Sequence, residues 1–136
     1  MYVNVHNPSF AGGEARAQLL PASDGQAELF TAKLEGTQQV PSNASTAVGA
    51  AIILVDKLID SVYLTGAFTG LSAAASGAHV HSGATGVNGA VFITLNFTAA
   101  TSGTLYSAAG VNTANKASIL GGNAYVNVHN ARFPGG

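Results

Sequence analysis

The chain contains no cysteine. It can therefore form no disulfide and has no thiolate to act as a nucleophile or a metal ligand, which excludes cysteine proteases, zinc ribbons and blue-copper sites. Charged side chains are scarce as well, with five Lys and Arg and six Asp and Glu, and the net charge is −1 without a basic run. Because nucleic-acid binding depends on clustered Lys or Arg, we expect no nucleic-acid partner.

Long hydrophobic runs are also missing. The longest apolar segment, residues 47–55, is interrupted by Gly49 and ends at Asp56, well short of the about 18 residues that a spanning helix needs, so we expect no membrane span. The first residues lack the basic start and apolar core of a signal peptide, which indicates either a cytoplasmic protein or an excised piece. The low charge and the many small polar residues favour a secreted protein, and we expect an extracellular or cell-surface location.

The two ends of the chain repeat each other. Residues 1–13 read MYVNVHNPSFAGG and residues 124–136 read AYVNVHNARFPGG, at a constant offset of 123. The length of 136 residues indicates a single domain over 1–136. The repeat favours a tandem array in which 1–20 are the final strands of a preceding unit and 27–136 are the main body. The alternative is two similar strands within one domain. The nine identical pairs are Tyr2/Tyr125, Val3/Val126, Asn4/Asn127, Val5/Val128, His6/His129, Asn7/Asn130, Phe10/Phe133, Gly12/Gly135 and Gly13/Gly136.

Most of the chain between these ends has strand patterns separated by Gly-rich turns. One short helix is expected at 112–120, with Asn112 as its N-cap and Gly121 at its end. Seven or eight short strands indicate an all-β fold, an antiparallel Greek-key-like sandwich or barrel. The expected strands are 14–20, 27–35, 47–56, 61–69, 78–81, 90–98 and 125–129.

Histidines occur only within two short motifs. In His79-Val80-His81 the two imidazoles share one strand face, with Cα atoms about 6.5 Å apart. In Tyr-Val-Asn-Val-His, which ends at His6 and again at His129, the Tyr, Asn and His share a polar face that would be costly to bury without a purpose. If this face lies beside the first motif, the result is a three-histidine site.

Three imidazole nitrogens without a thiolate suit copper(II) or zinc. Copper(II) forms the more stable complexes, so copper is the expected ion and zinc is the alternative. We expect the ligands to be His79, His81 and His129, with His6 as a partner in the same site or in a second one. A metal-free seam of hydrogen-bonded histidines is the structural alternative. The expected neighbours of the ligands are Asn127, Tyr125, Asn4 and Tyr2.

Four segments resemble the CHRD domain family, the chordin-type domain, as one unit of a bacterial tandem-repeat protein. They are FTAKLEGTQQVP at 30–41, AHVHSGATGVNGAVFITL at 78–95, GGNAYVNVHNARFPGG at 121–136 and FAGGEARAQL at 10–19. The family pattern continues after the last Gly-Gly pair into a strand E-I-R-G-Q-L, whereas here the matching segment is GEARAQL at 13–19. A sheet without that strand exposes a pairing edge. We expect residues 14–20 to fill it, within the chain or in a homodimer formed by strand exchange.

Three functions follow from these patterns. The first is a metal-binding module of a secreted or surface tandem-repeat protein, with a metal ion and neighbouring repeats as its partners. The second is a metal-free structural or adhesive repeat. The third is a copper or zinc enzyme, for which the sequence shows no accompanying base.

Overall fold

The computed structural model describes residues 2–18 and 25–136, and between 2 and 18 it describes only some of the side chains. Eight strands form the body of the protein, together with one 3-10 helix and one α-helix. The elements are β1 (Tyr2–Asn7), β2 (Phe10–Gln18), β3 (Ala27–Glu35), η1 (Gly36–Gln38), β4 (Val48–Asp56), β5 (Ser61–Thr69), β6 (Ala75–Ser82), β7 (Val91–Thr94), β8 (Asn96–Phe97), β9 (Gly103–Gly110), α1 (Thr113–Leu120) and β10 (Ala124–Asn130).

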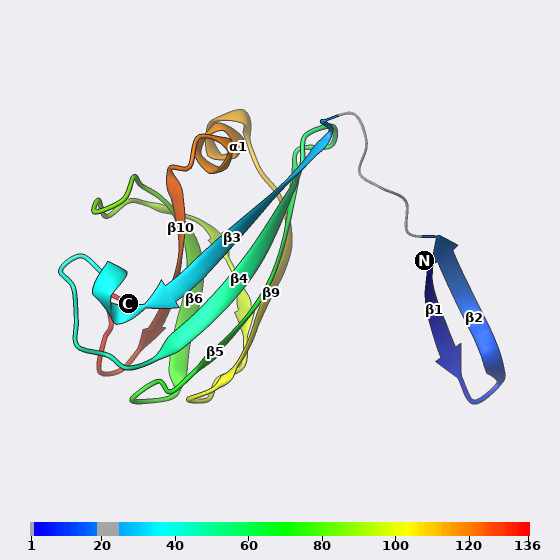
Figure 1. Ribbon diagram of the computed structural model, residues 1–136, viewed down its shortest axis with the longest axis horizontal. Helices are drawn as coiled ribbons and strands as arrows, with labels where there is room; N and C mark the ends of the chain where they lie inside the picture. The colour runs from blue at the N-terminus through cyan, green and yellow to red at the C-terminus, as the bar shows by residue number, and fades with distance from the viewer. Residues whose placement is uncertain (1, 19–24) are drawn as a thin grey trace.

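The body is a sandwich of two antiparallel sheets (Figure 1). One sheet has the order β3-β4-β5-β9-β8 and the other has the order β10-β6-β7. The sheets do not close into a barrel, so of the two expected architectures the sandwich is confirmed. No helix of the described chain is long and apolar enough to cross a membrane.

Alternating side chains build the core between the sheets. On β3, Phe30 and Leu34 pack inward while Leu29 is 62% exposed, as the alternation predicts. The second sheet contributes Ala78 and Val80 from β6, both almost fully buried. The odd-numbered neighbours on β6 therefore point to the other face of this sheet, away from the core.

Several elements match their predicted bounds. Strands β3 and β5 begin and end at the predicted residues. Helix α1 starts after Asn112, whose side chain accepts a hydrogen bond from the Asn115 backbone N–H at 2.9 Å, and the helix ends at Gly121. Strand β9 was not predicted, because GTLYSAAG has Gly at both ends and few β-branched residues; its partners β5 and β8 determine its conformation.

Strands β1 and β2 form a two-stranded sheet of their own (Figure 1). The predicted strand 14–20 begins earlier, at Phe10, and its last two residues lie outside the described chain. Residues 15–18 pair with β1 and, among the described strands, with no other. Closure of the open sheet edge by residues 14–20 therefore stays a prediction.

Candidate metal centre

Strands β6 and β10 carry the candidate ligands and lie side by side. They pair antiparallel, with His79 opposite Asn127, His81 opposite Tyr125 and His129 opposite Gly77. Opposite residues of two strands share one face, so all three histidines lie on the face that points away from the core. Gly77 leaves space beside the rings, since a Cβ there would lie 3.3 Å from Cε1 of His79 and 3.6 Å from Cδ2 of His129.

The three imidazoles converge. One ring nitrogen from each of His79, His81 and His129 lies within 4.8 Å of the other two. The shortest separation joins His79 Nδ1 to His129 Nε2, at 3.0 Å. The ring centroids of His79 and His81 are 5.7 Å apart and those of His81 and His129 are 6.0 Å apart. The structure thus brings together three of the four histidines that the sequence singled out.

Backbone carbonyls determine which nitrogen of two rings carries the proton. His81 Nδ1 lies 3.0 Å from the Gly89 carbonyl oxygen, and His129 Nδ1 lies 3.0 Å from the Pro134 carbonyl oxygen. A carbonyl can only accept, so both Nδ1 atoms donate. The Nε2 atoms of the neutral rings then keep their lone pairs, which is the usual arrangement of a metal-ligating histidine and its supporting hydrogen bond.

The Nε2 atom of His81 has no hydrogen-bond partner. His81 is only 8% exposed, and this nitrogen is buried. A buried lone pair without a partner costs free energy, and in native structures such an atom usually signals an unseen water or ion.

The sequence model of the CHRD domain family matches residues 30–136, more than half of the chain and all of the second sheet. The chain belongs to the CHRD domain family. The match includes the three converging histidines and excludes the β1–β2 hairpin. No curated protein and no solved structure matched the chain.

A loop of the CHRD domain covers His81. The Tyr125 ring stacks on the His81 ring at 4.9 Å between centroids and 9° between planes, and the Tyr125 hydroxyl accepts a hydrogen bond from the Gly89 N–H at 3.2 Å. Gly89 packs so tightly that a Cβ would collide with the Ser82 carbonyl. The loop therefore positions its carbonyl against His81 through contacts that a larger residue at 89 would break.

Burial and mutual repulsion keep two of the rings neutral. Burial is the main cause that lowers the pKa of His79 below 6.5, and the nearby His129 and His81 lower it further. Burial also lowers the pKa of His129, against a raising effect of the bond to Pro134 and together with repulsion from His81. Neutral imidazole is the form that binds a metal ion.

Asn127 shares the face of the three histidines, but its side chain bonds to other groups. It is 3% exposed; its Nδ2 donates to the Gly135 carbonyl at 3.0 Å and its Oδ1 accepts from Gln39 Nε2 at 2.7 Å. Asn4 makes the corresponding bond to the Gly12 carbonyl at 3.3 Å. Both asparagines stabilise the turn that follows their strand.

The expectations for His6 and Tyr2 remain open, because their side chains lie outside the described part of the structure. The carbonyl partners Gly89 and Pro134 were not foreseen. Backbone groups contribute through their position alone, so no residue type in the sequence signals them.

Proposed function

We propose that this CHRD domain binds a copper(II) ion through His79, His81 and His129, and that it serves as a metal-binding module of a secreted or surface tandem-repeat protein. The observation that carries the proposal is the buried, unpartnered Nε2 of His81, which lies in a cluster of three imidazoles. A bound ion would use this lone pair.

The spacing of the nitrogens supports the proposal. Metal–nitrogen bonds of about 2.0–2.1 Å place two ligand nitrogens roughly 2.9 Å apart at a right angle and roughly 3.4 Å apart at a tetrahedral angle. The 3.0 Å between His79 Nδ1 and His129 Nε2 falls in this range. His79 would bind through Nδ1 with its proton on Nε2, and small rotations of the rings would bring in the third nitrogen.

The donor set favours copper(II) over the other divalent ions. Three neutral nitrogens without a carboxylate form the group among the described residues, which is unsuited to magnesium or calcium. Copper(II) stands highest in the first-row stability order, and zinc is the alternative. The remaining coordination position would be taken by water.

The test is metal titration of the protein without a purification tag. We expect one copper(II) per chain by calorimetry, with nitrogen hyperfine structure in the electron paramagnetic resonance spectrum. His79→Ala should lose both, because it removes one of the three donors; its position is only partly buried. Zinc titrated in competition tells which ion binds more tightly.

The matched control is His6→Ala, which removes the fourth histidine of the chain. An unchanged stoichiometry and spectrum would assign the site to the three clustered histidines alone. Loss of binding in this variant would show that His6 is a ligand, in the same site or in one shared between chains. Absence of tight binding in the native chain would overturn the proposal.

A metal-free structural repeat is the second candidate. The hydrogen bonds from His81 and His129 to backbone carbonyls, and the one between His79 and His129, favour it because they stabilise the turns without an ion. Under this alternative His79→Ala changes stability to the same extent with and without copper.

The tandem-repeat part of the proposal is supported by structure as well as sequence. Gly13 and Gly136, which are 123 residues apart, have φ angles of 113° and 110°, and a Cβ at either would collide with the carboxamide of Asn4 or Asn127. Sequencing the coding region on both sides of this segment tests it. Further YVNVHN motifs at the same spacing support a repeat array, and unrelated flanking sequence contradicts it.

A further inference from the structure

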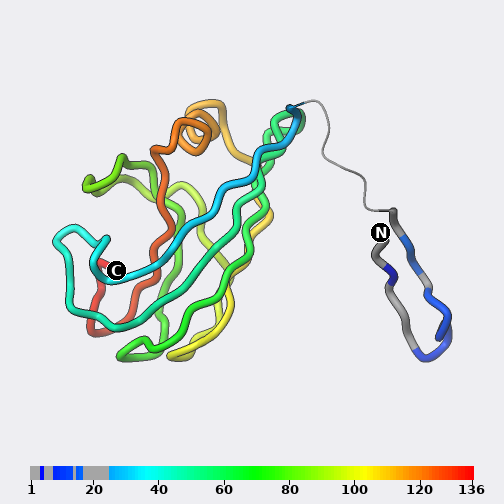
Figure 2. The backbone as a smooth tube through the Cα atoms, viewed as in Figure 1, coloured from blue at the N-terminus to red at the C-terminus, as the bar shows by residue number. Residues whose placement is uncertain are grey.

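One face of the five-stranded sheet is uncovered. The second sheet packs on one side of this sheet, and no segment of residues 25–136 crosses the other side (Figure 2). Every second residue of β3, β4, β5 and β9 points to this outer face. The solvated face of an antiparallel sheet is usually polar, but here several of the exposed side chains are large and apolar. They are Leu29, Val48, Ile52, Tyr63 and Tyr106.

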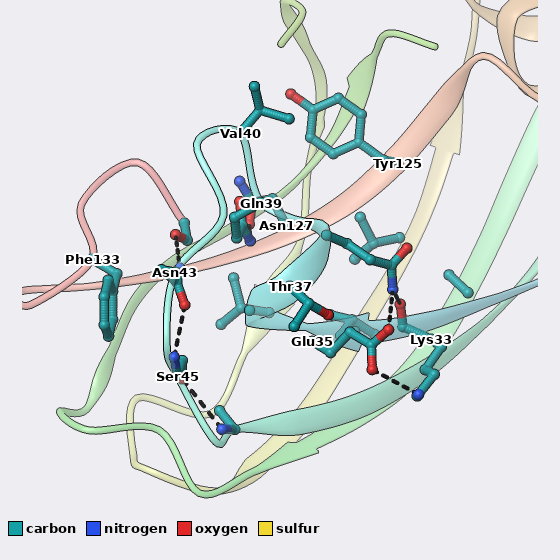
Figure 3. Close-up of a pocket in the computed structure, with 18 of the residues that line it drawn as sticks. Lys33, Glu35, Thr37, Gln39, Val40, Asn43, Ser45, Tyr125, Asn127 and Phe133 are labelled. Carbon is teal, nitrogen blue, oxygen red and sulfur yellow. Dashed lines mark hydrogen bonds and ion pairs between the residues drawn. The ribbon is translucent and has the colours of Figure 1, made fainter. Parts of the chain in front are cut away.

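The middle of the outer face is uncharged. Its charged side chains are Lys33 and Glu35 on the edge strand β3, and Asp56 at the end of β4. Lys33 Nζ lies 2.6 Å from Glu35 Oε2, so this pair is neutral as a whole (Figure 3). Scarcity of charge at the centre is typical of a protein–protein interface. A second copy of this face would therefore meet no repulsion there.

The outer face is also large enough for a stable interface. Strands β3, β4 and β5 have nine residues each and β9 has eight. With strands about 4.8 Å apart and a rise of about 3.3 Å per residue, four strands cover roughly 19 Å by 30 Å, or about 570 Å² before the relief of the side chains is counted. A standard interface buries about 800 Å² per partner. The face therefore has the size that a stable dimer needs.

The register of the sheet arranges the large and small side chains of this face in two adjacent rows, two residues apart on each strand. On β3, β5 and β9 a large side chain in one row has a smaller one beside it in the other row, and on β4 both are large and aliphatic. The first row consists of Leu29, Leu54, Tyr63 and Ala108. The second row consists of Thr31, Ile52, Thr65 and Tyr106.

We propose that this outer face binds the same face of a second copy of the chain, in a dimer whose two-fold axis crosses the strands between the two rows. The rotation lays each strand over its own copy in the opposite direction, so the first row faces the partner's second row about 10 Å away. Tyr63 then lies over the partner's Thr65, and Leu54 lies over the partner's Ile52 at the centre. Large side chains thus meet small ones on three of the four strands.

This pattern favours a second copy over an unrelated protein, because both members of each large and small pair come from one surface. The charges at the margin agree with it. The same rotation lays Lys33 over the partner's Ala27, and Ala27 pairs with Asp56 on the neighbouring strand. A lysine of one copy therefore lies close to an aspartate of the other, and charges of opposite sign attract.

Sedimentation of the full chain tests the dimer. We expect the mass to rise with concentration from 13.5 kDa towards twice this value. Ile52→Lys should lose the dimer, because it places an ammonium group against the partner's Leu54. The matched control is Val91→Lys, which adds the same charge to β7 in the other sheet at nearly the same exposure, 47% against 46% for Ile52. This control should dimerise like the native chain.

Exchanging one contact pair tests the orientation of the two copies. Thr65→Tyr alone should lose the dimer, because it opposes two tyrosines. The double variant Tyr63→Thr with Thr65→Tyr exchanges the two side chains and should restore the dimer. Urea unfolding of each variant shows that it is folded, and if Ile52→Lys does not fold, these two variants still give the answer.

Three results would overturn the dimer as described. A native chain that stays monomeric at every concentration assigns the outer face to a partner of another kind. Equal dimerisation of Ile52→Lys and Val91→Lys shows that the dimer uses another surface. A double variant that stays monomeric, like Thr65→Tyr, contradicts the two-fold arrangement.

Dimerisation and metal binding are separate properties. The three clustered histidines lie on the other sheet, and EDTA is present in every sample. Failure of the copper proposal therefore leaves the dimer intact, and a monomeric chain leaves the histidine cluster unchanged.

Discussion

Asn127 and Asn4 perform the same task in two places. Each side chain donates to the first glycine carbonyl of a Gly-Gly pair, and each second glycine has a positive φ that L side chains rarely adopt. The neighbouring histidines depend on this turn, because the carbonyl of Pro134 that orients His129 belongs to it. The polar face of β10 therefore carries both the asparagine that stabilises the following turn and a ligand of the candidate metal site.

Replacing Asn127 by alanine should lower stability. The substitution removes two part-buried hydrogen bonds, to the Gly135 carbonyl and from Gln39 Nε2, each of which contributes about 0.5–1.5 kcal/mol. Urea unfolding of the metal-free protein measures it. Asn96→Ala, at an exposed position of β8, serves as the control and should leave the midpoint unchanged. Equal effects of the two substitutions would contradict the claim that Asn127 stabilises this turn.

Acid should destabilise the metal-free protein. The pKa values of His79 and His129 are lowered in the folded state from 6.5, first of all by burial, so the unfolded chain binds more protons. The stability from their neutral forms is fully present above pH 6.5 and is lost as the pH falls from there through the lowered pKa values. Urea midpoints at a series of pH values measure this loss.

The matched comparison for the acid effect is His79→Gln, which should flatten the dependence of the urea midpoint on pH. His6→Gln measures how much of that pH dependence comes from the histidine in the β1–β2 hairpin. A native profile that stays flat from neutral pH down to pH 5 would speak against buried, neutral rings.

The elements differ in how much of their structure is local. Helix α1 carries its own start and stop, Asn112 and Gly121, and strand β3 carries a clear alternation. Strand β9 has neither, and forms because β5 and β8 offer edges on both of its sides. An element can thus be predicted from the sequence where its capping residues or its hydrophobic alternation are clear. Elsewhere the neighbouring strands determine whether a strand forms.

Removal of the helix cap should cost about 1 kcal/mol. Asn112→Ala deletes the acceptor for the Asn115 N–H and leaves that donor to solvent. The free energy of unfolding measures the loss, and Asn112→Asp should restore most of it because a carboxylate accepts the same bond. If the aspartate variant is as unstable as the alanine one, the cap is not the cause.

At the scale of the whole molecule, the candidate site ties β6 to β10, which are separated by about 50 residues in the chain and joined only in the folded state. Metal bound to the folded form alone therefore adds to the global stability. The groove lined by β3 and β10 is a second feature of the whole molecule, because these two strands belong to different sheets.

Copper(II) should raise the free energy of unfolding of the native protein by about 2.7 kcal/mol at a concentration of 100 times its dissociation constant. Urea unfolding with and without the ion measures this shift. His129→Gln should remove the shift, because it deletes one of the three donors. A shift of the same size in both proteins would place the ion elsewhere.

The sequence by itself determined what depends on short range: the alternation that puts Tyr125, Asn127 and His129 on one face, the shared face of His79 and His81, and the helix cap. These follow from backbone geometry over a few residues. The repeat is read directly from the identity of the two end segments. Only the tertiary structure decided that β10 lies beside β6, that the Gly89 and Pro134 carbonyls orient two rings, and that a groove remains open beside β10. Such contacts join distant segments through backbone atoms, which every residue type possesses, so no residue pattern encodes them.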